Sequence, residues 1–226
     1  MTAGDRPAAT GVLAGPGGRA PARPRSPGIR LAALYARSRR FPAAVAAIAA
    51  CGLGLRIALT GHWDTYGALQ LPLVFETAAA MVVTVTTASP LGEPERVTGR
   101  RLPYLRLTFT LGLTALAMGA LAAASIGGHL DGRVLDVLRN LAGVTGIGLL
   151  CAAALGSGLA WAGPAGYLLA GTYALYTQWH HPALTTPWLW PARPPHDLGA
   201  AACAGLVFAA AITIITARGC RDRVLE

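Results

Sequence analysis

Six long apolar runs constrain the fold of this chain more than any other feature. A helix needs about 20 mainly apolar residues to cross the hydrocarbon core of a bilayer. The runs cover residues 42–60, 68–88, 104–126, 136–156, 159–178 and 197–217. Because lipid offers no partner to backbone polar groups, each run is expected to form an α-helix. The sequence therefore predicts an all-α, polytopic membrane protein with six transmembrane helices.

Composition supports the membrane class. Hydrophobic residues make up 54% of the 226 residues, and the charged share, 13%, is about half that of a soluble domain. All 19 basic residues are arginines, a bias that indicates a GC-rich genome such as those of many bacteria. The net charge of +9 comes from arginines in the tail and beside the apolar runs, so we expect lipid headgroups as partners and no nucleic acid.

The segments before and after the runs are polar. Residues 1–28 are rich in Pro, Gly, Ala and Arg and poor in large apolar side chains, which predicts a disordered tail. Residues 29–41 place apolar side chains near one helical face and arginines beside or opposite it, which predicts an amphipathic helix on the membrane surface. A basic segment that merely flanks the first span explains them equally well. Residues 218–226 form a second tail.

Arginine placement predicts the orientation. Eight arginines precede the first run, four lie in or beside the loop between the second and third runs, and three follow the last run. The loops on the opposite side hold only Arg133 and Arg193. Since cytoplasmic loops carry an excess of basic residues, both termini are predicted to lie inside, with the chain in the cytoplasmic membrane.

Three ionisable residues stand inside the apolar runs, namely Arg56, Glu76 and Arg139. A charge within hydrocarbon is costly and is usually paired or turned toward water. Counted along their helices, all three fall in the outer leaflet. One hypothesis is that Glu76 pairs with Arg56 or Arg139. The alternative is that each arginine extends separately to the outer interface.

Small residues at four-residue spacing predict where helices approach closely, because membrane helices pack through such stripes. The stripes are Gly148, Ala152 and Gly156, then Gly158, Ala162, Gly166, Ala170 and Ala174, and finally Ala201, Gly205 and Ala209. Whether they face the same chain or a second copy stays open at this point.

The inner loop at residues 89–103 carries charges of both signs, at Glu93, Glu95, Arg96, Arg100 and Arg101. A short helix from about Pro94 would have acidic residues near its positive N-terminal end. The loop is either a docking surface for a partner or a solvated charged turn.

This layout resembles the membrane subunits of type-2 exporter-class ABC transporters. Those permeases have a cytoplasmic surface helix, six spans, a charged coupling helix between spans two and three, and a partly re-entrant hairpin between spans five and six. Glu95-Arg96-x-x-Gly99 is similar to the family's Glu-(Arg)-x-x-Gly coupling segment, although Arg100 and Arg101 replace the usual Thr-Leu-Glu. The resemblance implies a permease that pairs with a second copy or a sister permease. It also implies a separate ATP-binding subunit.

The loop between the last two runs contains tryptophans, prolines and ionisable residues, among them His180, His181, Trp188, Trp190, His196 and Asp197. An irregular cap at the outer headgroups, with the tryptophans in the interfacial belt, is the default interpretation. A metal site is a minor alternative, because the spacing matches no ligand signature.

No enzyme motif is present. GxxxxGK[ST] is impossible without lysine, and HExxH and GxSxG are absent. We therefore expect no enzyme activity, cofactor or resident metal. A non-transporting membrane scaffold, or a membrane enzyme that uses the outer histidines, are the rival functions.

Overall fold

The computed structural model describes residues 40–61, 65–87, 102–126, 134–177, 187–194 and 196–218, and these residues contain helices and no strand. The α-helices are α2 (Phe41–Thr60), α3 (Thr65–Thr87), α5 (Leu102–Ser125), α6 (Val134–Leu155), α7 (Ala162–Thr177) and α8 (Leu198–Arg218). The 3-10 helices are η2 (Ser157–Leu159) and η4 (Trp190–Ala192). Each α-helix begins and ends within three residues of one of the apolar runs.

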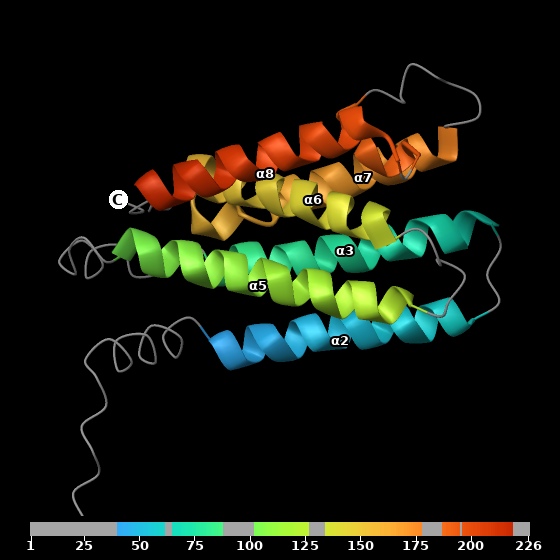
Figure 1. Ribbon diagram of the computed structural model, residues 1–226, viewed down its shortest axis with the longest axis horizontal. Coiled ribbons are helices and arrows are strands. Elements are labelled where there is room, and N and C mark those ends of the chain that lie inside the picture. Colours follow the sequence, from blue (N-terminus) through green and yellow to red (C-terminus); the bar gives the residue numbers. More distant parts are fainter. Residues whose placement is uncertain are drawn as a thin grey trace, which may run out of the picture.

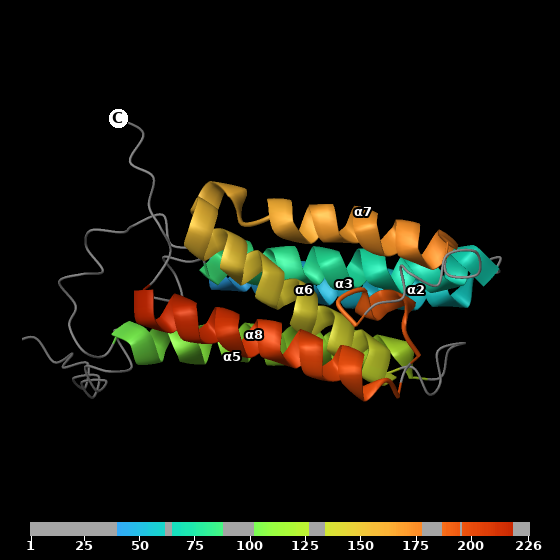
Figure 2. The ribbon, with the colours of Figure 1, turned by 90° about the horizontal axis from the view of Figure 1, so that it is seen from above.

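The α-helices lie side by side in one bundle (Figure 1). The central helix α6 contacts α3, α5, α7 and α8, while α2 packs against α3 and α5. Seen from above, α7 lies along one side of the bundle, with α5 and α8 along the other (Figure 2). The start of α2 and the end of α8 lie at the same end of the bundle, and η4 lies at the opposite end (Figure 1). We call that opposite end the cap end.

Five of the helices are long and apolar enough to cross a membrane. These helices are α2, α3, α5, α6 and α8, and the apolar stretch of each is 18 to 22 residues long. The remaining predicted span, residues 159–178, contains α7, which has 16 residues. That length is short of the roughly 20 residues that a crossing helix needs. Among the described residues the structure therefore shows five candidate membrane spans, and the sixth crossing stays a prediction.

The connection between α6 and α7 depends on a glycine. Gly156 follows the last residue of α6 with a φ of 93°, a left-handed conformation that glycine adopts without steric cost. The turn η2 comes next and leads the chain back along the bundle as α7. The four-residue spacing predicts Gly156 in an interhelical stripe, whereas in the structure it forms this reversal.

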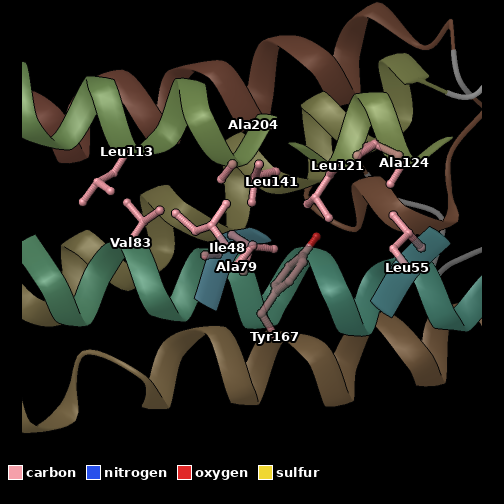
Figure 3. Packing of buried hydrophobic residues seen from close by; sticks show 14 of the residues in the cluster. Ile48, Leu55, Ala79, Val83, Leu113, Leu121, Ala124, Leu141, Tyr167 and Ala204 are labelled. Atoms are coloured by element: carbon pink, nitrogen blue, oxygen red, sulfur yellow. The ribbon is translucent and has the colours of Figure 1, made fainter. Parts of the chain in front are cut away.

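The core is made mostly of Leu, Ala, Ile and Val side chains contributed by every long helix. Ile48, Leu55, Val83, Leu113, Leu121 and Leu141 are among its buried members (Figure 3). Helices α6 and α8 approach so closely that a Cβ on Gly146 would lie 2.9 Å from the backbone of Phe208. This close approach lets backbone atoms make the van der Waals contacts that hold membrane helices together.

Of the other small residues predicted to lie at helix interfaces, some are buried in the structure and some are exposed. A Cβ on Gly148 would lie 2.5 Å from Thr84 of α3, and Ala152 is fully buried. These two residues therefore lie at an interhelical seam. Gly158 and Gly166 are exposed, and no described atom lies within 4 Å of a Cβ built on either one. Ala162, at the first residue of α7, is half-buried.

Candidate functional site: a polar cluster beneath a cap

The described residues between α7 and α8 are packed against the cap end of the bundle. We call these residues, 187–194 and 196–197, the cap. Its short helix η4 contacts α6, α7 and α8. The described backbone hydrogen bonds of the cap stay local, as when the N–H of Arg193 donates to the carbonyl of Trp190 at 3.1 Å. The cap is therefore a small folded unit that rests on three helices.

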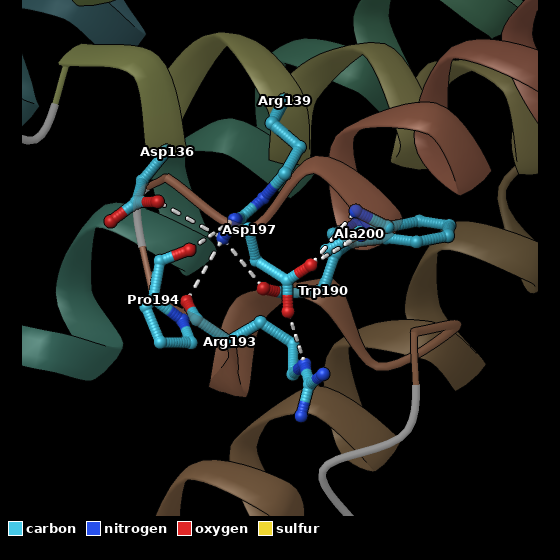
Figure 4. A network of polar contacts seen from close by, with 8 residues as sticks. Asp136, Arg139, Trp190, Arg193, Pro194, Asp197 and Ala200 are labelled. Carbon is cyan, nitrogen blue, oxygen red and sulfur yellow. Dashed lines mark hydrogen bonds and ion pairs between the residues drawn. The ribbon is translucent and has the colours of Figure 1, made fainter.

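Arg139 of α6 holds the cap through the cap's main chain (Figure 4). Its Nη1 donates to the carbonyl of Pro194 at 2.9 Å, and its Nη2 donates to the carbonyl of Trp190 at 2.6 Å. Nη2 also lies 3.3 Å from the carbonyl oxygen of Arg193. A guanidinium is always charged and presents its donors in a rigid fork, so one side chain can bind three carbonyl groups.

Carboxylates inside the bundle balance the charge of Arg139. Asp136 lies one turn earlier on α6, and its Oδ1 is 3.0 Å from Nη2 of Arg139. Asp136 is also in the first turn of α6, where the helix dipole favours a negative charge. The carboxylate of Glu76 on α3 is 1% exposed and interacts electrostatically with Arg139. Together with Tyr167, these side chains make what we call the polar cluster, which is Glu76, Asp136, Arg139 and Tyr167.

The side chain of Trp190 points from the cap into a slot in the bundle. It is 2% exposed, and its indole stacks on the ring of Tyr167 with the centroids 4.7 Å apart. A Cβ on Gly143 would lie 2.4 Å from the indole Cζ2, so the slot exists because position 143 has no side chain. The expectation that Trp190 belongs to the interfacial belt is therefore wrong. Trp188, by contrast, is 53% exposed.

Asp197 joins the cap to α8. Its Oδ1 accepts hydrogen bonds from the N–H groups of Gly199 at 2.8 Å and Ala200 at 3.1 Å, which makes it the N-cap of the helix. Its Oδ2 accepts a hydrogen bond from Nε of Arg193 at 2.6 Å. The hydrogen bond from Ala200, followed by the interactions with Arg193 and Gly199, lowers the pKa of Asp197 from its ordinary value.

Arg56 lies in different surroundings from Arg139. It is exposed, and its Nη1 donates to the carbonyl of Ala124 at 3.4 Å and to the carbonyl of Ile126. These carbonyls belong to the C-terminal end of α5, where the helix dipole favours a cation. The position suits the interpretation of an arginine that extends to the interface. The pairing of Glu76 with one arginine stays a hypothesis, which its electrostatic interaction with Arg139 supports.

Other predicted site residues lie outside the described residues. These are the coupling-loop residues Glu93, Glu95, Arg96, Gly99, Arg100 and Arg101, together with His180 and His181. His196 of the cap is exposed, and the carboxylate of Asp197 is bound as described above. Within the described residues, no group of three or more His, Cys, Asp or Glu side chains could hold a metal ion.

Sequence reasoning missed four features of this site, namely Asp136, Gly143, Tyr167 and the buried position of Trp190. Asp136 left a readable signal, because its spacing of three residues from Arg139 puts both side chains on one face of a helix. The slot of Trp190 left no such signal in the sequence, because it joins residues from α6, α7 and η4, which are far apart in the chain.

The chemistry of the site is that of a sealed charge network. It combines one guanidinium, buried carboxylates and a phenol with an aromatic ring as its cover. Ionisable groups within apolar helices are retained where they serve structure or a transport pathway. Comparison with known proteins gives no match, whether to a family model, to a curated protein or to a solved structure.

Proposed function

We propose that the chain is the transmembrane permease subunit of an ABC-type exporter, powered by a separate ATPase subunit. The observation that carries the proposal is the cap, which lies between the last two helices and packs on α6, α7 and α8. The resemblance to type-2 exporters places a partly re-entrant hairpin at this point of the chain. A mere connecting loop would have no need of a buried arginine that binds three of its carbonyl groups.

On this proposal α7 is the fifth of six crossings. Its 16 residues rise about 24 Å, against about 30 Å of hydrocarbon. Large side chains cover its outward face, where Leu169 is 72% exposed and Tyr173 is 59% exposed. Trp161 precedes the helix and Tyr176 is near its end, both with exposed rings. Aromatic side chains at both ends suit the two headgroup levels of a crossing helix.

Both ends of the chain then lie in the cytoplasm and the cap lies outside. Support comes from the bundle, in which α2 begins and α8 ends at the end opposite the cap (Figure 1). The arginine-rich segments at residues 1–40, 96–106 and 218–223 belong to that same side under the positive-inside rule. The protein would thus be a multi-pass protein of the cytoplasmic membrane.

The partners would be an ATP-binding subunit at the loop of residues 89–103 and a second permease, either another copy or a sister chain. Exposed glycines support the second partner. A Cβ on Gly112, Gly119 or Gly205 would meet no described atom within 4 Å, which leaves room for a close-packed helix.

A non-transporting scaffold within a membrane complex is the alternative. The observation in its favour is the tight filling of the interior, where Trp190 occupies the space over Gly143 and Thr84 occupies the space over Gly148. A scaffold needs this rigidity and no path through the bundle.

Affinity purification of the tagged chain in mild detergent tests the proposal. We expect an ATPase subunit to co-purify, and we expect Glu95→Ala with Arg96→Ala to release or uncouple it. The matched control is His196→Ala, a change at an exposed residue of the cap. Recovery of the folded chain with membrane partners but without ATPase activity would favour the scaffold.

A further inference from the structure

We propose that the cap is a removable plug, in which Trp190 seals the polar cluster in the closed state and leaves its slot to open the cluster to water. The inference concerns this chain alone, so it holds or fails independently of the ATPase partner. Three features of the described residues lead to it, namely the few attachments of the cap, an unsatisfied indole N–H and the chemistry that the ring covers.

The cap is attached to the bundle at few points. Arg139 binds its carbonyl groups, and the O–H of Tyr167 donates to the carbonyl of Trp188 at 3.0 Å. Pro191 lies against Gly171, with its Cγ 3.5 Å from the position of a Cβ there. The backbone hydrogen bonds of residues 189–194 stay within the cap, and Asp197 remains bound to the start of α8, so residues 187–194 can move outward without breaking them. Both of these polar attachments come from side chains, which can change rotamer.

The closed position leaves a polar group of the plug unsatisfied. The indole Nε1 of Trp190 has no hydrogen-bond partner among the described residues, although the side chain is 2% exposed. Buried indole N–H groups usually find an acceptor, and tryptophan prefers the membrane interface, where its N–H reaches water. Moving the ring outward would satisfy this donor. Hydration of the indole N–H in the open position therefore offsets part of the cost of separating the ring from Tyr167.

The ring covers groups that would otherwise be open to water. The ring of Tyr167 stacks on the indole of Trp190, and Arg139 of the polar cluster binds the carbonyl group of Trp190. Cys203 of α8 is half-buried and packs against the core cluster that contains Tyr167 and Trp190. Departure of Trp190 would expose this group of side chains to the aqueous phase at the cap end.

Cys203 is a native reporter for the test. In the full chain with Cys51, Cys151 and Cys220 replaced by Ala, reconstituted in vesicles, a charged methanethiosulfonate reagent is added from the cap side. Such a reagent does not enter hydrocarbon, so it reaches Cys203 only by water. We expect slow labelling of this background. Gly143→Ala should raise the labelling rate on the order of tenfold, since overpacking a filled core shifts the balance toward the open position.

Gly166→Ala is the matched control, because that glycine is exposed and a Cβ there meets no described atom within 4 Å. It should label at the background rate. Tyr167→Phe removes the hydroxyl that donates to Trp188 and keeps the ring. It should raise the labelling rate several-fold without overpacking, and it serves where Gly143→Ala does not fold. Equal labelling rates in the background and in every folded variant would overturn the plug.

Discussion

The two ends of the bundle are stabilised in different ways. At the end opposite the cap, α6 and α8 meet through the buried apolar side chains of Leu149, Ala152, Ala211 and Ile215. At the cap end the same helix α6 contributes Asp136 and Arg139, and both are buried. In lipid, apolar side chains gain little by leaving the surface, so the first end depends on close fit and the second on individual polar bonds. Substitutions should therefore act according to volume at one end and according to charge and hydrogen bonding at the other.

The largest loss of stability is expected for Arg139→Gln. It removes the bonds to the carbonyl groups of the cap and leaves the carboxylate of Asp136 buried without its cation. Breaking one side of a buried ion pair costs about 3–5 kcal/mol. The free energy of unfolding of the variant and of the parent chain is measured by unfolding in mixed micelles of mild detergent and SDS. The control Arg56→Gln, at an exposed residue, should cost far less, and similar losses for the two variants would remove the distinction between the arginines.

A loss of about 2–4 kcal/mol is expected for Leu149→Ala, because this fully buried side chain would leave a cavity between α6 and α8. Labelling of Cys203 should stay at its background rate in this variant, since the cap is not involved. The same assay on Leu206→Ala, where the side chain is 71% exposed, should show little change in stability. Faster labelling of Cys203 in Leu149→Ala would mean that the two ends are coupled.

Tyr167→Phe should cost about 1 kcal/mol, the usual contribution of one hydrogen bond, because the ring still stacks on Trp190. Tyr173→Phe is its counterpart on the outward face of the same helix, where the side chain is 59% exposed. Thermal unfolding should separate the two variants. A loss as large as that of Arg139→Gln would show that the hydroxyl does more than bind the cap.

The smallest effect is a dependence of stability on pH through Asp197. Its pKa is lowered in the folded state, so its stabilising contribution is present above the unfolded pKa of about 3.9 and is lost as pH falls through the lower folded pKa. Asp197→Asn should retain the helix cap and lose the ion pair with Arg193. The melting temperature of the variant should therefore change less than that of the parent as the pH falls from about 5 to about 3. An unchanged slope in the variant would assign the acid sensitivity to other carboxylates.

Five of the helices could be predicted from the sequence because each one is an apolar run long enough to cross a bilayer. The ends of α2 and α8, for example, fall within one residue of the predicted boundaries. The length of α7 was less predictable. The sequence places only Ser157 and Gly158 between two apolar runs, whereas the structure uses Gly156 through Trp161 to reverse the chain.

The site was predicted only where it depends on a single residue type in an unusual place. Arg139 and Glu76 stood out as charges in apolar runs, and both are buried in the polar cluster. The slot of Trp190 could not be predicted, because it depends on the absence of a side chain at Gly143, about fifty residues earlier in the chain. A glycine in a helix rich in Ala and Gly carries no sign of which ring will cover it.

Labelling of single cysteines in intact cells tests the central claim, a six-span bundle with the cap outside, most directly. One variant carries Trp188→Cys in the cap, and another keeps only Cys220 near the C-terminus. We expect an impermeant thiol reagent to label position 188 in intact cells, and position 220 only after permeabilisation. Protection of position 188 together with labelling of position 220 in intact cells would contradict the account. That result would mean that α7 does not cross the membrane or that the bundle is inverted.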